Sequence, residues 1–102
     1  MLENLTLATF SPLVGETFRL HVPPAHVLDL VLVEATPIVA ESPAHAANRR
    51  KTPFTLIFNG PPHVVASQHM YPIEHETLGR YELFVVPIGP KHGAMQYQVI
   101  FT

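Results

Sequence analysis

The chain has 102 residues, of which 47% are hydrophobic and 14% are charged, and its formal net charge is −2 at pH 7. This length predicts a single domain over residues 1–102, and the composition excludes an intrinsically disordered chain. The near-neutral charge argues against nucleic acid or an anionic membrane as a partner, and the absence of cysteine excludes disulfides and thiolate chemistry.

Neither a signal peptide nor a membrane span is expected. The start of the chain, Met1 to Asn4, lacks the positive charge and the apolar run that open a secretory signal. The longest apolar stretch, Val27 to Val33, is interrupted by Asp29 and falls far short of the ~20 residues of a membrane helix. A cytoplasmic location is therefore the default expectation, and export as part of a larger assembly stays open.

Alternation of apolar and polar residues predicts the first strands. Leu5 to Val14 is mixed and allows a helical turn or a short strand, which Gly15 ends. Thr17–Val22 alternates cleanly, as is typical of a half-buried strand. His26–Ala35 is apolar on both faces, so we expect a central strand there. We expect Asp29 within it to be exposed or locally capped, because burial would require a partner for its carboxylate.

A long loop is expected over Thr36–Thr52. It combines prolines, small residues and the basic triplet Arg49, Arg50 and Lys51. The triplet favours a solvated loop over a phosphate site. Loops of this length in compact domains are functional or flexible, so this loop is the first place to look for a partner contact.

Four further strands are predicted in the second half of the chain. Phe54–Phe58 places large apolar residues on one face, and Gln68–Ile73 follows, with Pro72 pointing to an edge or to a strand end. Arg80–Ile88 is apolar on both faces and is the second candidate for the centre of a sheet. Met95–Phe101 alternates and should form a hairpin with it.

The fold class follows from these elements. Helical periodicity is nearly absent, and turns recur at spacings that suit a β-sandwich or a small barrel. We expect a single small antiparallel sandwich or barrel of about six strands, with one short N-terminal helical turn as an option. The pattern leaves the strand order undetermined and leaves a homo-oligomer open.

Seven histidines, at positions 21, 26, 45, 63, 69, 75 and 92, are the most conspicuous polar feature. Neither a His-X-His pair nor a His-Glu-X-X-His helix occurs, and His69 and His75 would lie roughly 20 Å apart on one strand. We therefore predict no metal site. A small histidine-using metal-binding barrel, as a binding protein or an enzyme, remains an alternative.

Other catalytic patterns are also missing. No serine lies in a Gly-X-Ser-X-Gly elbow, and the five glycines stand singly, without a phosphate-cradling loop. The sequence thus predicts no catalytic residue and no cofactor. A small-ligand-binding β module is a third reading, and it would need a concave site lined by Tyr71, Tyr81 or Tyr97.

Several blocks of sequence resemble one family. They are Gly15–Phe18, Phe54–Pro61, Gln68–His75, Leu78–Gly79, Leu83–Gly89 and Tyr97–Phe101. In their order and spacing they are similar to a family of small bacterial proteins described as domain of unknown function 6916. The resemblance implies that the gene lies beside genes for phage-tail-collar or tail-fibre-like proteins. It hence implies a role in assembling, capping or decorating such a fibre. It brings no catalytic residues.

We therefore expect a non-enzymatic interaction or structural domain, an accessory component of a tail-fibre-like assembly with a protein partner. Two regions are the candidate contacts, the long loop and the edge formed by the fourth strand. Their candidate partner-binding residues are Arg49, Arg50, Lys51, Gln68, His69, Tyr71 and His75.

Overall fold

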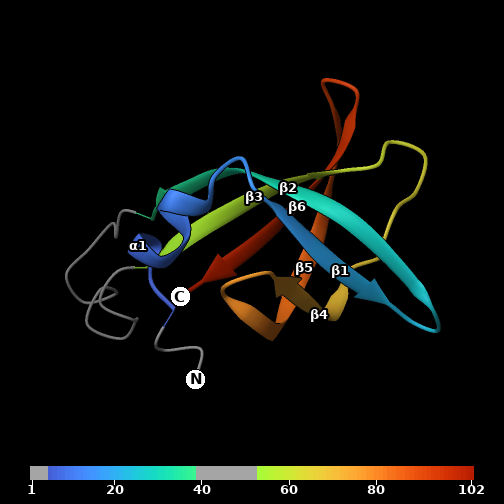
Figure 1. Ribbon diagram of the computed structural model, residues 1–102. Helices are drawn as coiled ribbons and strands as arrows, with labels where there is room; N and C mark the ends of the chain where they lie inside the picture. The colour runs from blue at the N-terminus through green and yellow to red at the C-terminus, as the bar shows by residue number, and fades with distance from the viewer. Residues whose placement is uncertain (1–4, 39–52) are drawn as a thin grey trace.

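The computed structural model describes residues 5–38 and 53–102. In these residues a short helical segment precedes six strands (Figure 1). The elements are α1 (Leu7–Phe10), η2 (Ser11–Leu13), β1 (Thr17–Val22), β2 (His26–Pro37), β3 (Phe54–Gly60), β4 (His69–His75), β5 (Gly79–Lys91) and β6 (Ala94–Phe101). The all-β prediction is confirmed. The segment Leu5 to Val14, for which a helical turn or a short strand was open, forms a helical turn. Among the described residues, no helix has the length and apolar character needed to cross a membrane.

The strands close into an antiparallel barrel in the order β1-β2-β3-β6-β5-β4. The sandwich alternative is thereby excluded. Strands β1 to β3 form a meander, and the chain then crosses over so that β4 lies beside β1, which is a Greek-key connection. The predicted hairpin of the last two strands is confirmed, with β5 pairing with β6 around a turn at His92 and Gly93.

Alternate residues of each strand fill the barrel. The clearest case is β3, in which Phe54, Leu56, Phe58 and Gly60 are buried and the residues between them are half-buried. The predicted inward face of this strand is therefore confirmed. This period of two is the geometric consequence of side chains pointing to opposite faces of a strand.

The helical turn α1 covers one end of the barrel, at the left of Figure 1. Thr6 caps it, since its hydroxyl accepts the Thr9 amide at 3.3 Å while its own amide donates to the Thr9 hydroxyl at 3.0 Å. The turn directs Phe10 into the core, where 1% of it is exposed. Its ring centroid lies 5.8 Å from that of Phe54 and 5.6 Å from that of Phe101.

The two strands expected at the centre of a sheet, β2 and β5, need a correction. A closed barrel has no central strand, and its outward face meets solvent on every strand. Accordingly Val27 on β2 is 50% exposed and Phe84 on β5 is 47% exposed. Asp29 is exposed as expected, and it lies opposite Arg19 of β1.

The edge predicted at Gln68–His75 is corrected at Ile73 and Glu74, because these two residues pair with β1 and close the barrel. The closure is short: two residue pairs, Arg19 with Glu74 and Leu20 with Ile73, join these strands. On its other side β4 pairs with β5 along all seven of its residues. Pro72 lies inside β4 and not at its end.

Candidate functional site

The connection between β3 and β4, residues 61–68, passes the end of the barrel that lies far from α1 (Figure 1). We call it the crossover segment. Two buried tyrosines hold it. The Tyr97 hydroxyl accepts a hydrogen bond from the Ala66 amide at 3.0 Å and donates to the Val64 carbonyl at 3.4 Å, while the Tyr71 hydroxyl donates to the Ser67 carbonyl at 2.7 Å. The crossover segment is thus fixed to β4 and β6.

This fixation turns two valines outward. Ala66 is drawn into the core, where 4% of it is exposed, whereas Val64 and Val65 are 46% and 59% exposed. Opposite them, the tip of the β1–β2 hairpin carries Val27, which is 50% exposed.

These valines border a cavity of about 230 Å³ between the hairpin tip and the crossover segment. We call it the valine groove. Its lining consists of Val22, His26, Val27, Leu28, Val64, Val65 and Ala66. None of these described residues carries a permanent charge, so the groove can bind apolar groups by burial. Single exposed aliphatic residues are ordinary on protein surfaces, whereas three around one cavity are typical of an interaction site.

A second cavity, of about 320 Å³, lies beside the same hairpin tip. It shares Val22, His26 and Val27 with the valine groove, and Pro72 and Arg80 contribute to it from β4 and β5. The hairpin tip therefore borders both cavities.

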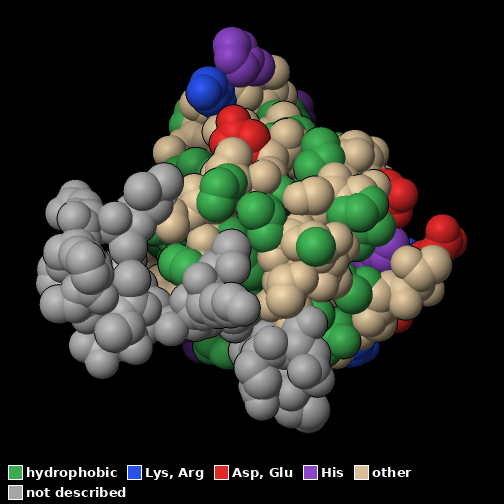
Figure 2. Space-filling view, turned by 90° about the vertical axis from the view of Figure 1, so that its left-hand side faces the viewer, with side chains coloured by type: hydrophobic (Ala, Val, Ile, Leu, Met, Phe, Trp, Pro, Cys, Tyr) green, Lys and Arg blue, Asp and Glu red, His purple; other side chains and the backbone are tan. Residues whose placement is uncertain are grey.

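The opposite end of the molecule differs. Figure 2 looks onto the side of α1 and shows hydrophobic side chains dispersed among polar atoms. Val14, which is 45% exposed, lies next to η2 in this region. It is as exposed as the valines of the groove but lines none of the cavities described here.

Outward-facing polar residues meet where β1 joins β4. The Glu74 carboxylate lies 3.0 Å from His21 Nε2 and 3.6 Å from Arg19 Nε. The hydrogen bond with His21 holds the pKa of Glu74 below its ordinary value, partial burial opposes this shift, and the charge of Arg19 adds to it. The cluster ties the short β1–β4 pairing together on its outer face.

His75 is the one buried polar residue among those described. Its Nδ1 accepts hydrogen bonds from the Thr77 and Leu78 amides, each at 3.2 Å. Because Nδ1 is an acceptor, the ring proton belongs on Nε2, which donates to Glu16 Oε1 at 2.7 Å. The ring also lies against Phe18, with centroids 4.6 Å apart. These contacts assign His75 a structural role in closing the β4–β5 turn.

The remaining histidines are dispersed. In residues 5–38 and 53–102, no group of three or more histidine, aspartate or glutamate side chains is placed to hold a metal ion. His26, His63, His69 and His92 are exposed, and His45 lies outside the described residues.

The predicted contact residues fall into three groups. Arg49, Arg50 and Lys51 lie outside the described residues. Gln68 and His69 are exposed, so a partner could reach them.

Tyr71 and His75, the other two predicted contacts, are each 4% exposed, and a partner would not reach their side chains in this conformation. Tyr97 is also buried, and its hydroxyl, like that of Tyr71, is engaged with the crossover segment. The tyrosine-lined concave site of the ligand-binding alternative is therefore not formed by these two residues.

Reasoning from the sequence missed the valine groove. Val27 was assigned to a strand buried on both faces, and Val64 and Val65 fell in a segment without a clear period. One signal was present, since the adjacent valines that follow Pro61-Pro62-His63 fit neither a turn nor a half-buried strand. The juxtaposition of this segment with residues 22–28 around one cavity is a long-range feature, which local patterns do not encode.

One family model matches nearly the whole chain. The model of the family described as "Domain of unknown function (DUF6916)" matches residues 5–101. The chain belongs to the DUF6916 family. The match includes the crossover segment, the β1–β2 hairpin and the valine groove, so the candidate site lies within the DUF6916 domain. No curated protein and no solved structure matches the chain.

Proposed function

We propose that this DUF6916 domain is a non-enzymatic interaction module that docks a protein partner in its valine groove. The observation that carries the proposal is the exposure of Val27, Val64 and Val65, at 46–59%, around one cavity. Full burial of an aliphatic side chain contributes about 1.5–3 kcal/mol, so covering three half-exposed valines supplies a substantial driving force for association.

The rigidity of the groove supports this proposal. Both walls are held in place, one by the β1–β2 pairing of six residue pairs and the other by the hydroxyls of Tyr71 and Tyr97. A binding surface that is already formed in the free protein avoids the entropic cost of ordering it on association.

The partner we propose is a tail-collar or tail-fibre-like protein. This choice rests on the association that the family resemblance implies, and the apolar groove is compatible with it. The domain would then act as an accessory component that assembles, caps or decorates a fibre.

Titration calorimetry with a purified tail-fibre-like protein tests the proposal. We expect wild-type protein to bind, and we expect Val65→Asp to weaken binding at least about tenfold, because the complex would bury an unpaired carboxylate. Val14→Asp is the matched control, since Val14 is similarly exposed but lies near α1.

Binding by Val14→Asp should equal that of the wild type. Equal binding by all three proteins would exclude the valine groove as the docking site, and no binding by the wild type would exclude this partner.

A further inference from the structure

Strand β4 has a backbone edge that the barrel leaves unused. All seven of its residues pair with β5, but only Ile73 and Glu74 pair with β1. On the side away from β5, the backbone of residues 69–71 therefore has no partner within the described parts of the chain. We call this stretch, His69, Met70 and Tyr71, the open edge.

Prolines explain why β1 does not cover the open edge. Pro72, the first residue of β4 beyond the pairing with β1, has no N–H to donate, so the ladder stops there. On the other side, β1 ends at Val22, and the turn that follows begins with Pro23 and Pro24, which also lack donors. The sequence itself thus prevents these segments from pairing.

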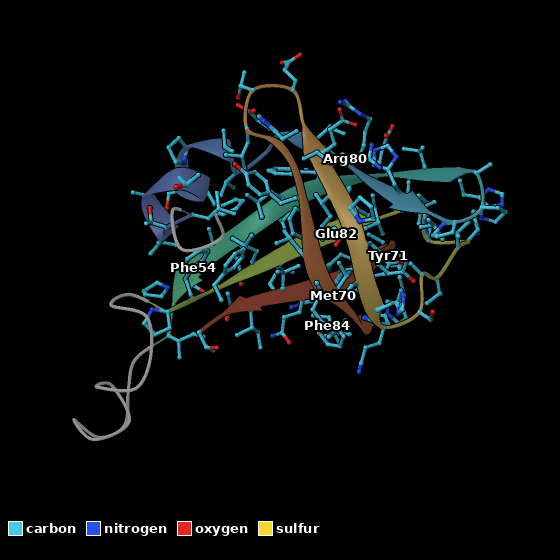
Figure 3. The ribbon with its side chains drawn as sticks, turned by 90° about the horizontal axis from the view of Figure 1, so that it is seen from below. Phe54, Met70, Tyr71, Arg80, Glu82 and Phe84 are labelled. Atoms are coloured by element: carbon cyan, nitrogen blue, oxygen red, sulfur yellow. The ribbon has the colours of Figure 1, made fainter. Side chains whose placement is uncertain are left out.

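Two of the three residues of the open edge are exposed, and a cavity lies next to its end. His69 and Met70 are exposed, and Met70 lies opposite Phe84 on the outward face of β4 and β5, as Figure 3 shows. The second cavity, of about 320 Å³, is lined by Pro72, the residue that follows the open edge, and extends to the hairpin tip. It shares Val22, His26 and Val27 with the valine groove, so the two cavities meet at the hairpin tip.

These features select one kind of occupant. Unpaired strand backbone is recognised by another extended strand, which supplies the missing N–H and C=O partners, while side-chain pockets set specificity. Here the pocket is the valine groove, which suits aliphatic side chains. Among the described residues that line the two cavities there is no carboxylate, so a basic side chain of the occupant would find no opposite charge on them.

We propose that the open edge is a strand-addition site, at which an extended segment of the partner protein pairs with residues 69–71 and places aliphatic side chains in the valine groove. The segment is uncharged or acidic and carries aliphatic residues at alternate positions, as the period of a strand requires. This inference rests on the proposed function and specifies how the partner is held.

Amide hydrogen exchange, resolved by residue, tests the inference on the full chain. In the free protein we expect alternate amides of the open edge to exchange fast, while those bonded to β5 exchange slowly. Addition of the tail-fibre-like protein should slow the fast amides. Slow exchange of all three amides in the free protein would overturn the inference, because the edge would already be paired.

A pair of synthetic peptides separates backbone pairing from side-chain docking. The first is an acetylated, amidated peptide of alternating valine and threonine, and the second is the same peptide with alternate backbone nitrogens methylated. We expect the first to shift the amide resonances of the open edge at millimolar concentration and the second to bind at least about tenfold more weakly. Equal binding by the two peptides, or shifts confined to Val27, Val64 and Val65, would overturn the inference.

The two proposals fail in different ways. A complex with the tail-fibre-like protein that slows exchange at Val64 and Val65 but not at the open edge would overturn strand addition and leave the valine groove as the docking site. Absence of that complex, together with selective binding of the unmethylated peptide, would support the open edge and overturn the proposed partner. If neither the protein nor the unmethylated peptide binds, both proposals are wrong.

Discussion

The backbone amide of Ala66 donates a buried hydrogen bond of 3.0 Å to the hydroxyl of Tyr97, a residue 31 positions further along the chain. This contact joins the crossover segment to β6 through the interior of the barrel. Because the amide has no partner in a regular strand, the tyrosine hydroxyl supplies the bond that burial requires. The same hydroxyl donates to the Val64 carbonyl, so it sets the conformation in which Val64 and Val65 face outward.

Removal of this hydroxyl should destabilise the protein. Tyr97→Phe keeps the ring and leaves the buried Ala66 amide without an acceptor, so we expect a loss of about 1–3 kcal/mol in the free energy of unfolding. Urea denaturation measures this loss. Tyr81→Phe is the matched control, because Tyr81 is only partly buried and its hydroxyl has no hydrogen-bond partner among the described residues. A loss of the same size in both variants would contradict the role assigned to Tyr97.

The contact between His75 and Glu16 should tolerate removal of the negative charge. Since Nε2 donates to the carboxylate, Glu16→Gln keeps an oxygen acceptor, and we expect a change in unfolding free energy below about 1 kcal/mol. Glu16→Leu removes the acceptor from a nearly buried N–H and should cost about 1–2 kcal/mol. Urea denaturation compares the variants, and nitrogen-15 NMR of the ring identifies the protonated nitrogen. A proton on Nδ1, or equal losses in both variants, would contradict the assigned tautomer.

Protonation of Glu74 in acid should lower the free energy of unfolding. Its pKa is held below the ordinary value of 4.5 by His21 and Arg19, so the unfolded chain binds a proton at this site more readily than the folded one. The stabilisation is therefore fully present above pH 4.5 and is lost as the pH falls through the lowered pKa of the folded state. Urea denaturation at a series of pH values below about 5 measures this loss.

Glu74→Gln should show a weaker dependence of unfolding free energy on pH across this range than the wild type. Glu82→Gln is the control, since Glu82 is an exposed carboxylate on β5 that lies opposite Pro72. It should retain the dependence of the wild type. Identical pH profiles for the wild type and Glu74→Gln would show that the cluster with His21 does not stabilise the closure between β1 and β4.

Local pattern sufficed to predict the strands but not their closure. Alternation located β1, β3 and β6, because a barrel strand buries every second residue whatever its neighbours are. Runs that are apolar on both faces located β2 and β5. The central position of β2 and β5 was wrong, since apolar residues such as Val27 and Phe84 on their outward faces imitate a strand covered on both sides. Closure between β1 and β4 depends on two residue pairs whose members lie more than 50 positions apart in sequence. The side-chain contact between His21 and Glu74 has a similar sequence separation.

The candidate site was less predictable, for a physical reason. The valine groove joins residues 22–28 to residues 64–66, and the tyrosine hydroxyls that hold it come from β4 and β6. Each of these residues has an ordinary local role, and their juxtaposition follows from the Greek-key crossover. Pro72, in contrast, gave a useful local signal: it was expected at an edge, and it lies where pairing with β1 stops.

Photo-crosslinking tests the central claim, docking of a protein partner in the valine groove, most directly. A photoreactive amino acid in place of Val65, and separately in place of Val14, reports which end of the barrel the tail-fibre-like protein contacts. We predict a crosslinked product from position 65 and none from position 14. Crosslinking from position 14 alone, or equally from both positions, would contradict the account.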